Sequence, residues 1–228
     1  MNWFADFLDL VFPRTCEACQ SVLLNQEKIL CTSCLIDLPR ADFKENDDTN
    51  LSKKFWGKLP VAHTLSFLKF TKKGKVQRLL HNLKYRNKPE VGILLGELFG
   101  RELKEIGFDK KIDLLISVPL HAQKLKQRGY NQADCIAEGL SKSLEIPFEK
   151  DLLKRIKFTE TQTRKSRFER FQNVENIFEV IDVEKIKNKR VAIVDDILTT
   201  GATIESCGIT LLERGCSEVS VMTIASAQ

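Results

Sequence analysis

The hydrophobic positions along the chain follow two periods, which predict strands alternating with helices. Residues 61–70 alternate apolar and polar positions, as a strand does, whereas residues 76–88 repeat apolar positions every three or four residues, as a helix does. The same patterns predict further helices at 91–106, 132–144 and 204–212, and further strands at 114–121, 148–156, 177–181, 191–194 and 219–225. This alternation predicts an α/β fold, a parallel sheet with flanking helices on both faces.

Three segments do not fit that alternation. Residues 2–12 place their apolar side chains on one helical face, which predicts a short amphipathic helix that Pro13 ends. Residues 42–54 are polar and poor in aliphatic side chains, as expected of a linker or an exposed loop. Residues 157–176 are polar and basic, and a segment of this length inside an α/β domain is typical of a lid or binding loop.

Composition restricts the class of protein. The chain has 228 residues, of which 43% are hydrophobic and 29% charged, as in a soluble globular protein. No apolar run approaches the ~18 residues of a membrane-spanning helix, so we expect no membrane insertion. The first residues include Asp6 and Asp9 and lack a basic leader, which argues against a secretory signal. We therefore expect a cytoplasmic protein.

The positive charge is concentrated in the middle of the chain. Residues 61–180 hold 24 basic and 15 acidic side chains, a net charge of +9, within a chain of net charge +5. Such an excess suits a polyanion, either a phosphorylated ligand or a nucleic acid. Solvated lysines on helix surfaces explain any single one of these charges equally well, so the charge alone assigns no function.

Four of the seven cysteines form two close pairs, Cys16 with Cys19 and Cys31 with Cys34. Two Cys-x-x-Cys pairs can supply four thiolates to one tetrahedral ion, so we expect a structural zinc site. A complete set of four ligands leaves no position for a catalytic water, and a redox Cys-x-x-Cys would not need a second copy. The scattered cysteines are expected to be packing residues, namely Cys135, Cys207 and Cys216.

These observations predict two folded parts. Residues 1–41 would hold the N-terminal helix and a small zinc ribbon, residues 42–57 the linker, and residues 58–228 the α/β domain. In an open α/β sheet, ligands bind beyond the carboxyl ends of the strands. We therefore expect the functional residues to follow the strands that end near residues 118 and 194.

The chemistry is most specific at Val191–Thr203. Four apolar residues lead directly into Asp195 and Asp196, and a Thr/Gly/Ala turn at 199–203 leads into a helix. Backbone N–H groups of such a turn and of the helix N-terminus can bind a phosphate. The Walker loop is excluded because no Gly-Lys-Ser/Thr follows, and the Rossmann fingerprint because there is one glycine instead of three. The alternative is a buried strand that ends in two solvated aspartates, followed by a threonine cap.

This stretch resembles the PRPP-binding signature of type I phosphoribosyltransferases, where PRPP is phosphoribosyl pyrophosphate. The resemblance implies that Asp195 and Asp196 hold the ribose hydroxyls and carry the catalytic role, with Mg²⁺ chelated mainly by the ligand. It also implies that the following loop residues hold the 5-phosphate: Thr199, Thr200, Gly201, Ala202 and Thr203. In hypoxanthine-type enzymes, an aspartate that acts as base occupies the position of Thr199, so the loop indicates PRPP without specifying the acceptor.

With the cysteine pairs, Lys84-Tyr85-Arg86, Val118–His121 and Arg128–Gln132 in one order, the chain resembles the ComF/GntX family of competence proteins. That resemblance implies a zinc ribbon before a type I phosphoribosyltransferase-like domain, with a role in DNA uptake and natural transformation. Asn87 stands where members often have glycine. The residues implied in diphosphate binding are Lys84, Arg86, Ser117, Pro119, His121 and Arg128, with 157–173 as the lid. Lys84 and Arg86 are also explained as plain surface residues, and His121 as a packed strand-end histidine.

Two functions follow from the sequence. The first is a Mg²⁺-dependent phosphoribosyltransferase with an unidentified acceptor. The alternative is a non-catalytic PRPP-fold scaffold that binds single-stranded DNA through its basic segment and zinc ribbon, with a competence helicase-like protein as a partner. Stacking on bases needs exposed aromatics, and few lie near basic residues: Tyr85, Tyr130 and Phe158.

Overall fold

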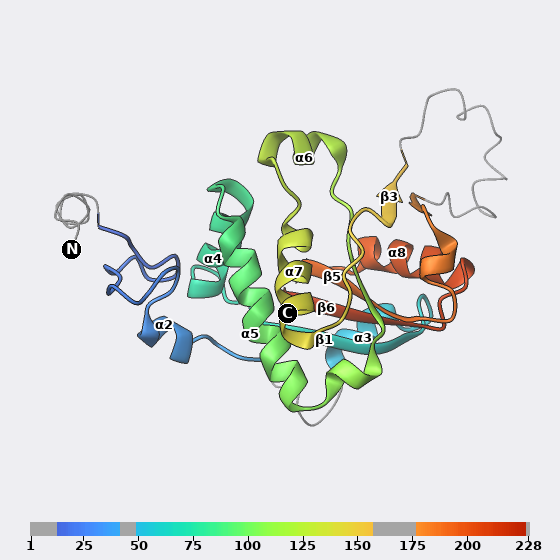
Figure 1. The fold of residues 1–228 in the computed structure, drawn as a ribbon, viewed down its shortest axis with the longest axis horizontal. Coiled ribbons are helices and arrows are strands. Elements are labelled where there is room, and N and C mark those ends of the chain that lie inside the picture. The colour runs from blue at the N-terminus through green and yellow to red at the C-terminus, as the bar shows by residue number, and fades with distance from the viewer. Residues whose placement is uncertain (1–12, 42–48, 157–176, 227–228) are drawn as a thin grey trace.

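A four-stranded parallel sheet forms the centre of the molecule (Figure 1). The computed structural model describes residues 13–41, 49–156 and 177–226. The sheet has the order β1-β6-β5-β2, and all neighbouring strands run parallel. Its strands are β1 (Val61–Lys69), β2 (Leu114–Ser117), β5 (Arg190–Leu198) and β6 (Glu218–Ser226). The predicted parallel sheet with flanking helices is confirmed.

Helices cover both faces of the sheet because its strands are apolar on both sides. Along β2, Leu115 joins one hydrophobic core, while Leu114 and Ile116 join the other. The first core is closed by α4 (Lys75–Tyr85), α5 (Pro89–Glu105) and α7 (Gln132–Leu144). The second is closed by α8 (Ala202–Glu213), by the short helix η1 (Lys53–Phe55) and by the antiparallel pair β3 (Leu153–Arg155) and β4 (Phe178–Val180).

Glycines bring α5 and α7 into backbone contact. A Cβ built on Gly139 would lie 2.1 Å from the carbonyl oxygen of Ile93, and one built on Gly96 would lie 2.2 Å from the carbonyl oxygen of Ile136. Neither distance leaves room for a side chain, so only glycine lets the two helices approach this closely. This contact fixes the position of α7, whose N-terminus faces the carboxyl end of β2.

The cysteine-rich segment, residues 13–41, packs directly on the larger domain. It contains α2 (Thr32–Ile36), and its buried Cys16, Ala18 and Cys34 share one hydrophobic core with α4. Near its end, Arg40 forms an antiparallel bridge with Leu68 at the edge of β1. The segment is therefore continuous with the core that lies under α4.

The region expected to be a linker is partly folded. Residues 49–55 form α3 (Thr49–Ser52) and η1, and the side chains of Leu51 and Phe55 are buried. The expectation of an exposed loop is wrong for these residues, because two apolar side chains four positions apart suffice to anchor one helical turn. Residues 42–48 lie outside the described residues.

Four other elements differ from the sequence prediction. An exposed helix, α6 (Ala122–Arg128), was not predicted because Leu125 is its only large apolar residue and gives no periodicity. The strand predicted at 148–156 is reduced to β3 and a single parallel bridge between Phe148 and Leu115. Short helices η2 (Phe108–Lys111) and η4 (Val183–Lys185) occupy connections. The predicted helix at 2–12 and the predicted lid at 157–176 lie outside the described residues.

Within the described ranges, the longest helices are too short or too polar to cross a membrane.

Candidate functional site

The two signature aspartates lie at the carboxyl end of β5, the strand between β2 and β6. Asp196 is buried, and its Oδ2 lies 2.9 Å from Nζ of Lys84 at the end of α4. Asp195 is half-buried, and one of its carboxylate oxygens accepts a hydrogen bond of 2.8 Å from the N–H of Asp196. The structure therefore joins Lys84 to the predicted ribose-binding acids.

Two adjacent carboxyls in this position influence each other. Burial raises the pKa of Asp195 to about 7, and the negative charge of Asp196 adds to the shift, whereas the ammonium of Lys84 opposes it. A ligand that donates hydrogen bonds to Asp195 would favour its charged form.

The loop after β5 has the geometry of an anion site. Gly201 adopts φ of 83°, a left-handed conformation, and a Cβ there would lie 2.9 Å from the ring of Phe55. The carbonyl oxygen of Thr199 accepts a hydrogen bond of 2.6 Å from Nζ of Lys54, which ties the loop to η1. α8 begins at Ala202, and the first N–H groups of a helix have no acceptor within it. Thr199, Thr200 and Thr203 are exposed, so an anion can reach these groups.

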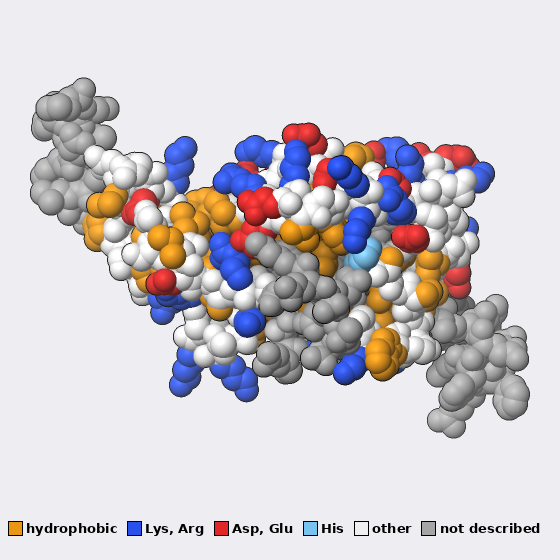
Figure 2. Space-filling model, turned by 90° about the horizontal axis from the view of Figure 1, so that it is seen from below, with side chains coloured by type: hydrophobic (Ala, Val, Ile, Leu, Met, Phe, Trp, Pro, Cys, Tyr) orange, Lys and Arg blue, Asp and Glu red, His pale blue; other side chains and the backbone are white. Residues whose placement is uncertain are grey.

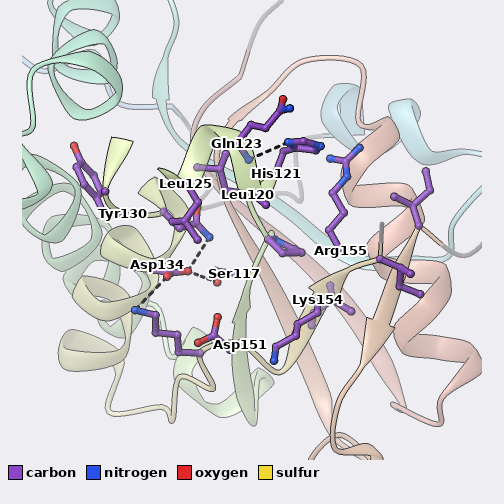
Figure 3. A pocket seen from close by; sticks show the side chains of 18 residues that line it. Ser117, Leu120, His121, Gln123, Leu125, Tyr130, Asp134, Asp151, Lys154 and Arg155 are labelled. Atoms are coloured by element: carbon purple, nitrogen blue, oxygen red, sulfur yellow. Dashed lines mark hydrogen bonds and ion pairs between the residues drawn. The ribbon is translucent and has the colours of Figure 1, made fainter. Parts of the chain in front are cut away.

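The end of β2 lies beside the aspartates. Val118 N–H donates a hydrogen bond of 2.9 Å to the carbonyl of Val194, the residue before Asp195. Ser117, Pro119 and His121 line an adjoining cavity of about 980 Å³ that extends to the β3–β4 pair (Figure 3). His121 is exposed and caps α6, with Nδ1 accepting a hydrogen bond of 3.3 Å from the N–H of Gln123. Three of the predicted diphosphate residues thus lie together.

Asp134 is a cavity residue that the sequence analysis missed. Its Oδ1 accepts hydrogen bonds from Ser117 Oγ at 2.6 Å and from Asn131 Nδ2 at 2.8 Å, and its Oδ2 lies 3.6 Å from Nζ of Lys150. Burial raises its pKa above the usual range of aspartate. The predicted N-cap role of Asn131 is confirmed by its hydrogen bond from Ala133 N–H. The sequence feature that could have identified Asp134 is its position in the first helical turn after Asn131.

The basic segment at the end of α4 meets the segment before α7. The guanidinium of Arg128 lies over the ring of Tyr85 at 5.2 Å, and the hydroxyl of Tyr130 donates a hydrogen bond to the carbonyl of Leu83. Arg86 is exposed, and Asn87 adopts φ of 51°, a left-handed geometry that asparagine tolerates better than most residues. The structure thus places Lys84 against Asp196 and Arg128 beside Tyr85, and it leaves Arg86 on the surface.

The four paired cysteines converge on one point. The Sγ atoms of Cys16, Cys19, Cys31 and Cys34 all lie within 4.8 Å of one another, and those of Cys19 and Cys31 are 3.7 Å apart. A tetrahedral zinc with Zn–S bonds of about 2.3 Å requires sulfur separations of about 3.8 Å. Hydrogen bonding to Ser21 lowers the pKa of Cys19 to about 6, whereas burial raises the pKa of Cys34. The donor set and its spacing can hold a zinc ion.

The turn between the cysteine pairs is held by a residue that the sequence analysis did not identify. Glu27 is buried, and its carboxylate accepts hydrogen bonds from Leu24 N–H at 2.8 Å and Thr32 N–H at 2.6 Å. These bonds tie the turn between the pairs to the residue that follows Cys31. Nothing in the local pattern distinguishes Glu27 from a solvated acid.

Comparison with known proteins agrees with this geometry. Residues 131–228 match the family described as phosphoribosyl transferase domain. Competence protein F of Haemophilus influenzae is 34% identical over 128 residues, 56% of this chain and 56% of that protein. DNA utilization protein YhgH of Escherichia coli K12 is 30% identical over 162 residues, 71% of this chain and 65% of that protein. The chain thus spans less than two thirds of the length of either relative.

Among solved structures, the glutamine phosphoribosylpyrophosphate amidotransferase of B. subtilis aligns with a TM-score of 0.43 and 21% identity. This alignment covers 63% of this chain and 30% of that one.

Proposed function

Because the chain carries a phosphoribosyl transferase domain and is homologous to competence and DNA-utilization proteins, we propose that it binds PRPP with Mg²⁺ at the carboxyl ends of β2 and β5. The observation that supports this most directly is the pair formed by Lys84 and Asp196 next to an exposed loop that begins a helix. The carboxylates for the ribose would come from the end of β5, and the N–H groups for the 5-phosphate from the loop and the helix that follow it.

The chemistry of the site suits transfer of the phosphoribosyl group. Asp195 and Asp196 would accept hydrogen bonds from the ribose hydroxyls, and the N–H groups of the loop would bind the 5-phosphate. Lys84 and the Ser117–His121 segment would face the diphosphate, whose negative charge grows as its bond to C1 breaks. Mg²⁺ would neutralise the diphosphate while keeping most of its waters, so few protein ligands are needed.

The Asp195→Asn/Asp196→Asn variant is expected to bind PRPP at least about 100-fold more weakly than the wild type. Each ribose hydroxyl loses a charged acceptor, and hydrogen bonds to charged groups contribute about 1.5–3 kcal/mol each. Calorimetric titration with PRPP, with and without Mg²⁺, measures this loss. The matched control is Glu213→Gln, an exposed carboxylate at the far end of α8. Unchanged affinity in the double variant would contradict the proposed site.

The acceptor must be recognised outside the signature loop. Thr199 carries a hydroxyl that cannot act as a base at neutral pH, so a proton acceptor for the incoming nucleophile would come from elsewhere. Release of pyrophosphate from PRPP in the presence of a candidate acceptor measures transferase activity directly.

A second candidate function is binding of single-stranded DNA, which the surface around Tyr85 favours. Tyr85 is 63% exposed, and it lies next to His81 and under the guanidinium of Arg128. An exposed ring among cations can stack on a base while the cations bind phosphates. Figure 2 shows that, on the face it presents, acidic side chains are interspersed among Lys and Arg. The exposed ring of Tyr85 therefore supports DNA binding more strongly than the net charge does. We place this role in the cytoplasm, with a competence helicase-like protein as partner.

Tyr85→Ala is expected to weaken binding of an oligothymidine by about 1–3 kcal/mol, because one base loses its stacking partner. Fluorescence anisotropy at several salt concentrations measures the affinity, and its slope against salt counts the phosphates that are contacted. Trp56→Ala removes an aromatic that is 66% exposed on the surface beyond η1 and serves as the control. An equal loss in both variants would argue against a specific platform at Tyr85.

For the cysteine cluster, we propose a structural zinc ion. All four donors are thiols of the chain, so no position is left for a substrate or a reactive water.

A further inference from the structure

Glu17 lies inside the first cysteine pair yet contacts the helix that carries Lys84. Its Oε2 accepts a hydrogen bond of 2.8 Å from Asn82 Nδ2, and the same amide lies 3.2 Å from the carbonyl oxygen of Glu17. Its Oε1 lies 3.0 Å from Nζ of Lys88. The carboxylate is only 17% exposed, so both contacts are partly shielded from water.

These two contacts lie on either side of Lys84 along the chain. Asn82 precedes Lys84 by two residues and Lys88 follows it by four, with the left-handed Asn87 between them. Lys84 itself extends to Asp196 across the end of the sheet. One carboxylate of the cysteine-rich segment therefore holds the chain on both sides of the residue that reaches the signature acid.

The segment is also held at the other end of α4, but by a weaker contact. Lys75, the first residue of the helix, lies 3.6 Å from Asp37, and the Asp37 side chain is 63% exposed. Surface pairs of this kind contribute about 0–1 kcal/mol. The structure thus offers two acids in the same segment that contact the same helix, one beside the site and one distant from it.

We infer that Glu17 is a positioning residue of the PRPP site, which holds the last turn of α4 so that Lys84 lies against Asp196. This inference rests on the proposed function, since it deepens the role of Lys84 in that site. Its consequence is that the folded cysteine segment supports the ligand site directly, beyond any contribution to overall stability.

The test compares PRPP affinity in Glu17→Ala, Lys84→Met and the double variant, with Asp37→Ala as the matched control. Glu17→Ala is expected to weaken PRPP binding about tenfold in the wild-type background and less than about twofold in the Lys84→Met background, because residues that act through one another are not additive. Glu17→Gln, which keeps an acceptor for Asn82, is expected to recover part of the loss. Zinc content and the unfolding midpoint are measured for every variant.

Two results of these titrations would overturn the inference. An equal loss in Glu17→Ala and Asp37→Ala would assign the effect to general docking of the segment. An additive loss in the double variant would show that Glu17 does not act through Lys84. Loss of zinc in Glu17→Ala would assign its effect to the cysteine cluster, which also contradicts a positioning role.

A second readout separates this inference from the proposed function. Lysines labelled by reductive ¹³C-methylation give one NMR signal each, and Lys84→Arg assigns the signal of Lys84. Glu17→Ala is expected to move that signal toward its position in Asp196→Asn, whereas Asp37→Ala leaves it unchanged. If wild-type protein fails to bind PRPP, the proposed function is contradicted, and this signal alone decides whether Glu17 positions Lys84. An unmoved signal in Glu17→Ala would refute the inference.

Discussion

Replacing Cys34 with serine is expected to abolish binding of the proposed zinc ion and to lower the free energy of unfolding by more than about 4 kcal/mol, the range reached when a structural metal is lost. Cys34 is buried, and its Sγ is one of the four that converge within 4.8 Å. The cysteine segment shares a hydrophobic core with α4, so unfolding of this segment would also expose apolar surface of the larger domain. Zinc analysis of protein purified without chelator, together with urea unfolding, measures both effects.

The control for this variant is Cys216→Ala, which removes a buried thiol outside the cluster. Its zinc content should equal that of the wild type. Wild-type protein without zinc, or a Cys34→Ser variant that retains it, would contradict a four-thiolate site.

Gly139→Ala is expected to lower the free energy of unfolding more than the addition of a methyl group at any other position of the α/β domain. The new Cβ would lie 2.1 Å from the carbonyl oxygen of Ile93 and 2.8 Å from the backbone nitrogen of Glu97. Backbone atoms cannot rotate away as a flexible side chain can, so α5 and α7 must separate. Overpacking in a core costs about 1–3 kcal/mol and occasionally more. We expect a loss of about 3 kcal/mol, measured by urea unfolding.

Glu138→Ala is the matched control, because the neighbouring side chain is exposed on the same helix. It should change the free energy of unfolding by less than about 0.5 kcal/mol. A similarly small change for Gly139→Ala would show that the two helices are not in backbone contact. Separation of the two helices in Gly139→Ala would also be expected to disturb Asn131, the N-cap of α7, and Asp134 in its first turn.

The sequence predicts the fold well where apolar residues recur with the period of a strand or a helix. The strands β5 and β6 were predicted because they are apolar on both faces, and the helices α4, α5 and α7 because each buries one apolar face. The helix α6 could not be found in this way, since its seven residues bury nothing. Residues 49–55 were missed for a related reason, because only Leu51 and Phe55 distinguish them from a polar loop.

The candidate site was predicted only where its residues are close together in the sequence. The signature aspartates, the loop and the cysteine pairs are local in sequence, so their spacing alone brings each set together. The partners of these residues lie far away along the chain: Glu17 is 65 residues from Asn82, and Ser117 is 17 residues from Asp134. Such contacts depend on how the elements pack, which periodicity does not describe.

The small helix before β1 limits where the chain can be shortened. A fragment that begins at Lys58 would retain every strand of the parallel sheet but would lack Phe55 and Lys54. The ring of Phe55 against Gly201 and the ammonium of Lys54 on the Thr199 carbonyl would then be missing, so the loop after β5 would lose its support. Such a fragment could keep its sheet and still lose its ligand, and a negative binding result from it would say nothing about the full chain.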